Sequence, residues 1–376
     1  MKISRIFLTL RVTASSGFQD NVWGSIFYET LCNMGYDVDF YPYDEAKIND
    51  DNKRKNNISQ ISENIFTVFA KKHKTKPYDL FLSYYHSGHV TPELFKRVRE
   101  LAFCLNYTTN FHQIEQYRPL LKEASLSIYA SQEASSFFSD NNFNGYYMPF
   151  AGLKKYSNNV TVKNKRVSFI GTAYGNRPYY LWRCLQNQLP IDIYGANWGK
   201  NHHKRAALRT LHLAGKILNS SKSIVDTAYR SMNDCILMDI NKNYNSALNA
   251  PLPDKEYFEL LANSSIVLNF PESRYNHDFL NHRVLIGANL RDFEVPMAGS
   301  LLLTQDSDEI KSCFKVGKEI DTFCNEWEMI DKINFYLKNP DLSNRVSISG
   351  YNRVLKEHLW EHRFKALFKH LESNFL

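Results

Sequence analysis

The hydrophobic positions of residues 1–150 alternate between short continuous runs and longer runs with helical spacing. The short runs are rich in β-branched and aromatic residues, which predicts strands. The predicted strands are Ile6–Leu10, Val38–Tyr41, Asp79–Tyr85, Phe103–Thr108, Leu126–Tyr129 and Tyr146–Met148. Helices are predicted between them at Trp23–Met34, Pro92–Leu101, Glu115–Lys122 and Gln132–Phe138, and a polar surface loop at Asn49–Asn57. Because strands alternate with helices, we expect a mainly parallel, doubly wound sheet.

A polar and basic stretch, Ala151–Lys165, interrupts this alternation, and we interpret it as a linker between two domains. The alternation then begins again with predicted strands at Val167–Gly171, Ile191–Tyr194, Ile266–Phe270 and Leu301–Thr304. The other elements predicted here are helices at Tyr179–Leu189, Lys204–Leu218, Ser223–Met232 and Asn289–Met297, a strand at Cys235–Asp239, and helical structure over Leu342–Leu371. The pattern therefore predicts an α/β protein with two Rossmann-like, doubly wound domains that face a cleft.

Composition narrows the class of protein. The chain has 376 residues, of which 43% are apolar and 14% aromatic, so it can bury a large core and is not intrinsically disordered. Its net charge of +7 indicates a mild attraction to nucleotides, phospholipid headgroups or nucleic acid. The basic residues are dispersed along the chain, so we do not expect nucleic-acid binding.

The cysteines and the apolar runs indicate where the protein acts. Six cysteines are scattered without CxxC pairs or the spacing of metal ligands, which is typical of reduced thiols in a cytoplasmic protein. No apolar run approaches the roughly 18 residues of a membrane-spanning helix. We therefore expect a cytoplasmic protein and leave open a peripheral association with the inner face of the membrane.

The segment Asn289–Gln305 carries the most chemical information. It predicts a short helix with one central glutamate, Glu294, then a glycine turn and a buried strand. A helical carboxylate that points into the ligand site of an α/β sheet can accept hydrogen bonds from sugar hydroxyls. Glu294 is therefore a candidate ligand for the ribose of a nucleotide, although an exposed helix position would also be compatible with the pattern.

The same segment resembles a known family. The pattern Arg291-x-Phe293-Glu294-x-x-x-Ala298-Gly299-x-Leu301 is similar to the C-terminal signature of bacterial glycosyltransferases of GT-B fold, of the spore-maturation (CgeB-like) type. Further segments agree with the signature in order, namely Val167–Thr172, Asn176–Arg177, Ile193–Gly195, Trp198, Tyr257, Ser264–Phe270, Gly350–Val354 and Glu357–Arg363. The resemblance covers roughly the C-terminal half, and the N-terminal half resembles the partner domain more loosely.

The resemblance implies a division of labour between domains. Residues 1–155 would form the acceptor-side domain, residues 166–350 would bind the nucleotide-sugar, and residues 351–376 would form a helix that crosses back to the first domain. Related retaining enzymes carry two glutamates, the first contacting the transferred sugar and the second the ribose. Glu294 aligns with the second, whereas Ile286 occupies the position of the first, so the sequence leaves retention or inversion open.

Other candidate donor-site residues follow predicted strands. Gly171, Thr172 and Arg177 form a strand-to-helix turn, where backbone N–H groups and a guanidinium could meet phosphate, although an ordinary turn fits the pattern as well. The remaining donor-site candidates are Tyr194, Asn269, Arg283 and Asn289. Arg291 could compensate the charge of the departing diphosphate, or it could form a buried salt bridge with a nearby aspartate, and the two hypotheses are equally compatible with the sequence.

In the N-terminal half, candidate residues also lie where predicted strands end. Ser16 and Gly17 follow the first strand, and His86 and His89 follow the third. Ser16, Gly17 and His89 are candidates for contacts with the acceptor. His112 follows the fourth strand, and His112 and His86 are candidates for a base that acts on the acceptor hydroxyl.

Two Asp-x-Asp strings bear on metal binding. One is Asp37–Asp39, beside a predicted strand, and the other is Asp306–Asp308, in a strand-to-helix turn where an aspartate would cap the helix. We interpret both as structural and expect neither a metal nor another cofactor.

Together with these features, the resemblance implies a metal-independent glycosyltransferase of cell-surface polysaccharide biosynthesis. It would move a sugar from a UDP- or GDP-linked donor to a glycan, lipid-linked or protein acceptor. A non-catalytic two-domain binder of nucleotides or sugars is the alternative, favoured by Ile286. A dinucleotide oxidoreductase is not expected, because no GxGxxG motif follows the first strand of either half.

Overall fold

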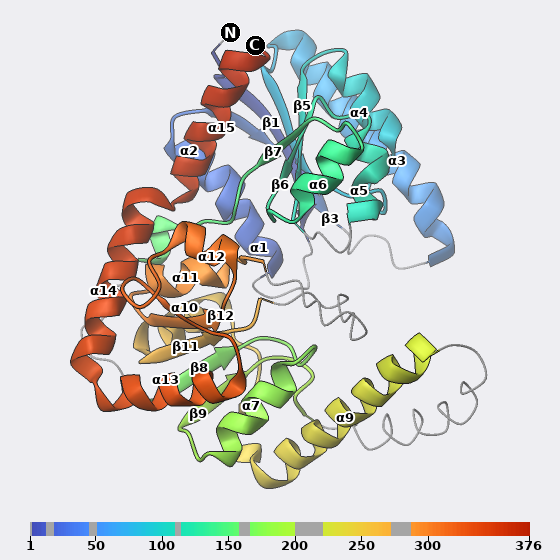
Figure 1. The fold of residues 1–376 in the computed structure, drawn as a ribbon. Helices are drawn as coiled ribbons and strands as arrows, with labels where there is room; N and C mark the ends of the chain where they lie inside the picture. The colour runs from blue at the N-terminus through green and yellow to red at the C-terminus, as the bar shows by residue number, and fades with distance from the viewer. Residues whose placement is uncertain are drawn as a thin grey trace. The chain divides into compact units, whose positions relative to one another are not determined.

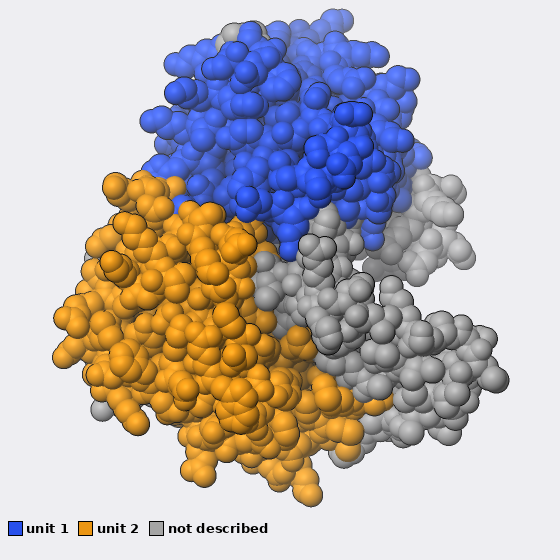
Figure 2. Space-filling view, in the orientation of Figure 1, with its two compact units in different colours: residues 1–151, 358–376 blue, residues 152–357 orange. Residues whose placement is uncertain are grey.

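The computed structural model describes residues 2–12, 19–44, 51–109, 114–157, 166–199, 221–271 and 287–376. These residues form two compact units (Figures 1 and 2). Unit 1 comprises residues 1–151 and 358–376, and unit 2 comprises residues 152–357. The chain therefore leaves unit 1, completes unit 2, and returns to unit 1 for its last helix.

Unit 1 is built on a parallel sheet with the strand order β2-β1-β4-β5-β6-β7, in which β3 also pairs with β1. Its strands are β1 (Arg5–Val12), β2 (Asp37–Phe40), β3 (Tyr43–Asp44), β4 (Leu80–Tyr84), β5 (Phe103–Thr108), β6 (Leu126–Tyr129) and β7 (Gly145–Tyr147). Ile6 of β1 pairs with Val38 on one side and with Leu80 on the other. The direction of winding therefore reverses between β1 and β4, and such a switch point is where open α/β sheets bind ligands.

Helices cover both faces of this sheet. They are α1 (Gln19–Gly24), a π-helical turn (Ser25–Glu29), α2 (Thr30–Asn33), α3 (Asp51–Thr75), α4 (Pro92–Arg99), α5 (Ile114–Leu121), α6 (Ala134–Asp140) and α15 (Trp360–Asn374). On one face, α3, α4 and α5 bury residues such as Phe69 and Phe95 against Phe81 of β4. On the other face, Phe27 of the π-helical turn and Trp360 of α15 pack around Tyr107 of β5. The apolar residues of α15 thus belong to the core of unit 1.

Unit 2 is built on a second parallel sheet, with the strand order β10-β9-β8-β11-β12-β13. Its strands are β8 (Val167–Ile170), β9 (Ile191–Tyr194), β10 (Leu248–Asn249), β11 (Ile266–Asn269), β12 (Leu301–Gln305) and β13 (Asp321–Phe323). Its described helices are α7 (Arg177–Gln186), α9 (Ser221–Asn243), α10 (Asp254–Asn263), α11 (Arg291–Met297), α12 (Asp308–Cys313), α13 (Glu326–Lys338) and α14 (Pro340–Glu357), with 3-10 turns at Lys154–Tyr156 and Asn245–Ala247. Winding reverses between β8 and β11, so the switch point of this sheet lies at their carboxyl ends.

The predicted fold class is confirmed, because the chain contains two Rossmann-like units with parallel sheets. The predicted end of the helix before β12 is also confirmed, since Gly299 has a φ of +76° and its amide donates to the Pro296 carbonyl. Helical structure over Leu342–Leu371 is present as two helices, α14 and α15. Among the described helices, none is both long and apolar enough to cross a bilayer.

Two predicted elements are wrong. The loop at Asn49–Asn57 is helical from Asp51 onward, because the apolar positions that follow, such as Ile65 and Phe69, anchor a long helix whose first turns are polar. The strand at Cys235–Asp239 lies inside α9, where Ile236 and Ile240 are spaced for a helix and pack into the core of unit 2. The predicted helix at Lys204–Leu218 lies outside the described residues.

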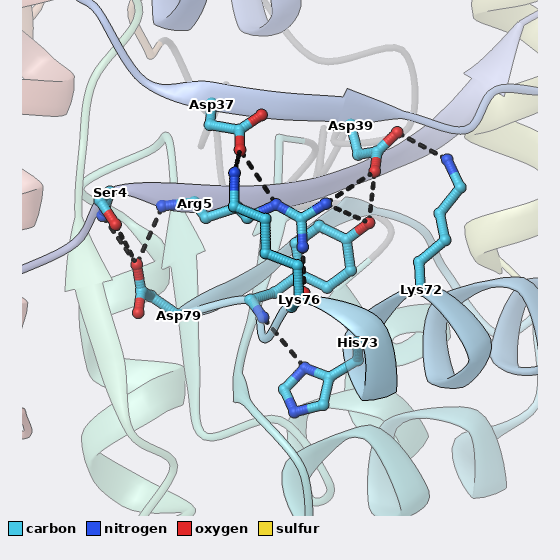
Figure 3. A network of polar contacts seen from close by, with 9 residues as sticks. Ser4, Arg5, Asp37, Asp39, Lys72, His73, Lys76 and Asp79 are labelled. Atoms are coloured by element: carbon cyan, nitrogen blue, oxygen red, sulfur yellow. Dashed lines mark hydrogen bonds and ion pairs between the residues drawn. The ribbon is translucent and has the colours of Figure 1, made fainter.

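The string Asp37–Asp39 belongs to a network of charges at the amino ends of β1 and β2 (Figure 3). Arg5 Nε lies 3.0 Å from Asp37 Oδ2, and Arg5 Nη2 lies 3.3 Å from Asp39 Oδ2. Lys76 adds an ion pair of 2.7 Å to Asp37, and Lys72 one of 2.6 Å to Asp39. Both carboxylates thus form ion pairs with cations of the chain. They lie at the amino ends of the strands, whereas the switch point of the sheet lies at the carboxyl ends.

The second string, Asp306–Asp308, differs in one detail from the prediction. The side chain of Ser307, rather than an aspartate, caps α12 by accepting a hydrogen bond from the Ile310 amide. Asp306 instead accepts a hydrogen bond of 2.9 Å from the Thr322 hydroxyl of β13 and pairs with Lys311.

Candidate functional site

Arg177 bridges the segments that follow β8 and β11, at the switch point of the sheet in unit 2. Its Nη2 donates a 2.7 Å hydrogen bond to the Phe270 carbonyl after β11, and its Nη1 donates a 3.2 Å hydrogen bond to the Thr172 carbonyl after β8. The guanidinium carbon also lies 3.8 Å from the ring centroid of Tyr174. Only 5% of Arg177 is exposed, so it ties the ends of the two strands together. The guanidinium nitrogens are thus already engaged by backbone carbonyls.

The turn after β8 is tightly packed against the end of β9. The Gly171 amide donates to the Tyr194 carbonyl at 2.8 Å, and the Gly171 carbonyl accepts from Trp198 Nε1 at 2.7 Å. Gly195 approaches so closely that a Cβ there would lie 2.2 Å from the Gly171 oxygen. Because the Gly171 amide donates its hydrogen bond within the sheet, a phosphate bound at this turn would require other backbone N–H groups.

The entrance to α11 is organised by a buried carboxylate. Asp292 accepts hydrogen bonds of 2.6 Å from Asn269 Nδ2 and 2.9 Å from the Thr304 hydroxyl on one oxygen, and of 2.9 Å from the Asn289 amide on the other. Burial raises the pKa of Asp292 to about 6, although these hydrogen bonds act in the opposite direction. Asn269 and Asn289, predicted as donor-site residues, are therefore brought together around Asp292. The adjacent Ala288 amide is held by Glu309 at 2.9 Å.

Glu294 follows Asp292 by two residues in α11 and is buried, with 6% of its surface exposed. This excludes the exposed helix position that the sequence allowed. The Tyr257 hydroxyl of α10 donates to Glu294 Oε2 at 2.6 Å. Burial raises the pKa of Glu294, while the Tyr257 hydrogen bond and the charge of Arg291 oppose this shift.

Arg291 lies beside this pair. Its guanidinium carbon is 5.9 Å from the Tyr257 ring centroid, and its Nε is buried without a hydrogen-bond acceptor among the described residues. Asp292 is the aspartate nearest to Arg291 in the sequence, and its carboxylate accepts hydrogen bonds from Asn269, the Asn289 amide and Thr304. The arrangement places a carboxylate, a phenol and a guanidinium together in unit 2.

Sequence reasoning overlooked the role of Asp292 and gave Tyr257 only as part of a resemblance. A signal for Asp292 was available, because an aspartate next to Phe293 in a helix that leads into a buried strand must find hydrogen-bond donors if it is buried. Tyr257 carries no such signal, since its partner is 37 residues away.

Tyr194, a predicted donor-site residue, is on β9. It follows Asp192 by two residues and shares its face of the strand. Burial raises the pKa of Tyr194, with a further contribution from Asp192.

In unit 1, the structure brings His86 and His89 together after β4, with ring centroids 3.6 Å apart. His89 Nε2 lies 3.4 Å from Nη1 of Arg11, which is on β1. The pair thus lies at the switch point of its sheet. The other predicted residues, Ser16, Gly17, His112, Arg283 and Ile286, lie outside the described residues. Among the residues that the structure describes, no group of three or more His, Cys, Asp and Glu side chains is arranged to hold a metal ion.

Two Rossmann-like units, with polar residues gathered at the switch point of the second, are the features of the GT-B class of nucleotide-sugar enzymes. Solved structures agree with this fold. A sucrose-phosphate synthase from Thermosynechococcus elongatus matches with a TM-score of 0.64 at 12% identity, over 98% of this chain and 99% of that one. HepE of Anabaena in complex with UDP and glucose matches with a TM-score of 0.58 at 9% identity, over 98% and 99%. An α-glucosyltransferase in complex with UDP and DNA matches with a TM-score of 0.60 at 11% identity, over 98% and 99%.

The sequence gives the family. A family model described as glycosyl transferase-like matches residues 179–369, about half of the chain. The protein therefore belongs to the glycosyl transferase-like family and is a glycosyltransferase. No curated protein matches its sequence.

Proposed function

We propose that the protein moves a sugar from a UDP- or GDP-linked donor to a glycan, lipid-linked or protein acceptor in the building of a cell-surface polysaccharide. The observation that carries this proposal is the buried Glu294, held by Tyr257 beside Arg291 in unit 2. An ionised carboxylate in this position is suited to accept hydrogen bonds from the hydroxyls of a ribose. The UDP and glucose bound by the structurally similar HepE support a uridine nucleotide as the first donor to test.

The other residues receive roles within this proposal. Residues contributed by unit 2 would contact the rest of the donor, namely Gly171, Thr172, Arg177, Tyr194, Asn269, Arg283 and Asn289. Arg291 would compensate the charge of the leaving diphosphate. His112 or His86 would take the proton of the acceptor hydroxyl, and Ser16, Gly17 and His89 would contact the acceptor.

Several finer points belong to the same proposal. The transfer would be independent of metal ions, since charge compensation would come from arginines and backbone N–H groups. The resemblance to the spore-maturation (CgeB-like) type, a cytoplasmic location and contact with the inner face of the membrane are proposed on the sequence alone.

Nucleotide binding tests the donor site first. UDP and GDP are titrated into the protein by calorimetry, with Glu294→Gln as the test variant and Glu259→Gln, an exposed residue of α10, as the matched control. Loss of hydrogen bonds to a charged group predicts that Glu294→Gln weakens binding by roughly 10- to 100-fold. Binding that is equally strong in all three proteins would place the ribose elsewhere.

Turnover is tested by nucleotide release from a panel of UDP- and GDP-sugars, with and without a cell-envelope glycan or lipid extract as acceptor. We expect acceptor-dependent release that persists in EDTA. The alternative function, a binder without turnover, is favoured by Ile286 at the position of the first family glutamate. It predicts tight nucleotide binding with no release from any sugar donor.

A further inference from the structure

Tyr257 and Glu294 form a buried pair that joins two helices of unit 2. Tyr257 lies in α10, and Glu294 lies in α11. Their oxygen atoms are 2.6 Å apart, and the two residues are 3% and 6% exposed. The Tyr257 ring packs edge-on against Phe258, with centroids 4.9 Å apart. Burial and this ring contact therefore restrict the phenol beside the carboxylate.

This hydrogen bond has an electrostatic consequence. Burial alone favours the neutral form of a carboxyl group. A phenol that donates to the carboxylate, and a guanidinium nearby, favour the ionised form. An ionised carboxylate is the better acceptor for two adjacent sugar hydroxyls, because it offers lone pairs on both oxygens and no proton.

The hydrogen bond also has a geometric consequence. A glutamate side chain has several rotamers, and ordering it on ligand binding costs conformational entropy. Tyr257 engages Oε2 and so restricts the orientation of the carboxylate about its terminal torsion. Oε1 is then the oxygen that a ligand hydroxyl can approach without breaking the internal bond.

We propose that Tyr257 is a positioning residue, whose hydroxyl fixes Glu294 Oε2 so that the carboxylate is presented to the two hydroxyls of a ribose. Tyr257 thereby sets the preference of the site for ribonucleotides over nucleotides that lack these hydroxyls. This inference rests on the proposed function, because it assumes that the ligand is a nucleotide. It adds a residue and a specificity to that function.

The test compares binding of UDP with 2′,3′-dideoxy-UDP, and of GDP with its dideoxy analogue, by calorimetry. The wild-type protein is expected to bind the ribonucleotide at least about tenfold more tightly, since hydroxyls that bond a charged group are lost in the analogue. Tyr257→Phe keeps the ring and removes the hydroxyl. It is expected to reduce this ratio several-fold, mainly by weakening the ribonucleotide.

Tyr336→Phe provides a matched control. The Tyr336 hydroxyl donates to Asp321 Oδ2 at 2.7 Å, so this variant also removes a buried tyrosine–carboxylate hydrogen bond within unit 2. A merely structural role for Tyr257 predicts that both variants lose stability and keep the wild-type ratio. A positioning role predicts that only Tyr257→Phe changes the ratio.

A double variant completes the design. If Tyr257 acts through Glu294, adding Tyr257→Phe to Glu294→Gln leaves the ratio where Glu294→Gln alone placed it. A wild-type preference for the ribonucleotide that survives in Tyr257→Phe would overturn this inference and leave the proposed function intact. A wild-type protein that binds none of the four nucleotides would overturn both.

Discussion

Asn269 donates a hydrogen bond of 2.6 Å to Asp292, and this contact ties the end of β11 to the first turn of α11. Thr304 of β12 donates to the same carboxylate oxygen, at 2.9 Å. Asp292 has no exposed surface, whereas Glu294 follows it by two residues in the same short helix. A buried carboxylate with three hydrogen-bond donors thus anchors the short helix that carries Glu294.

The raised pKa of Asp292, about 6 in the folded chain against 3.8 as its ordinary value, predicts a pH-dependent stability. A carboxyl group with a raised pKa stabilises the fold below its unfolded pKa and loses this contribution as pH rises through the folded one. The free energy of unfolding of the wild type relative to Asp292→Asn should therefore fall by on the order of 1–3 kcal/mol between pH 4 and 7. Urea unfolding of both proteins at each pH measures this difference, and effects of other groups cancel. A difference that does not vary with pH would contradict the prediction.

Asp39 should show the opposite sign. Burial acts to raise its pKa, but the hydrogen bonds from Lys72 and Tyr78 and the charges of Lys72 and Arg5 outweigh burial and lower it. A carboxyl group with a lowered pKa contributes stability above its unfolded pKa, and this is lost as pH falls through the folded one. The advantage of the wild type over Asp39→Asn should therefore grow from pH 3 to pH 5, to roughly 1 kcal/mol after allowance for partial exposure. Urea unfolding of both proteins at these pH values measures the difference. A difference that stays constant or shrinks from pH 3 to pH 5 would contradict the structural role of Asp39.

Gly195 allows β8 and β9 to approach each other. It has a φ of +145°, and a Cβ at this position would lie 2.2 Å from the backbone oxygen of Gly171. Gly195→Ala should lower the free energy of unfolding by on the order of 2–4 kcal/mol, since neither the conformation nor the backbone contact can be relieved cheaply. Gly199→Ala is the control, because a Cβ there would meet no atom within 4 Å. Equal stability of the two variants would show that the turn relaxes more readily than its geometry indicates.

The alternation of strands and helices in the sequence was sufficient to predict the central strands of both sheets, because buried parallel strands such as Val167–Ile170 and Leu301–Gln305 are short, largely apolar runs. The short strands β3, β10 and β13 were not predicted. The apolar run at Cys235–Asp239 has the same local appearance, and only the packing of Ile236 and Ile240 makes it helical. Local patterns could not resolve this case, since a short apolar run fits either structure.

Residues of the candidate site could be predicted only where they fall in the segment that resembles the family or at the end of a predicted strand. Glu294 and Asn269 fall at such places, and the structure gathers Asn269 with Asn289 around Asp292. The pairing of Tyr257 with Glu294 depends on how α10 and α11 pack on one sheet. Arg177 illustrates a further limit, because the sequence indicates a cation at a turn but not that backbone carbonyls occupy it.

The bracing role of Arg177 is testable by Arg177→Lys. The guanidinium donates to the Phe270 carbonyl through two nitrogens and to the Thr172 carbonyl through a third. A lysine ammonium keeps the charge but cannot reproduce this planar fork, so we expect the free energy of unfolding to fall by about 1–3 kcal/mol. Arg345→Lys, at an exposed position of α14, should change it by less than about 0.5 kcal/mol. If urea unfolding showed no difference between the two variants, Arg177 would not be needed to hold β8 and β11 together, and its charge would be the property to examine with nucleotide.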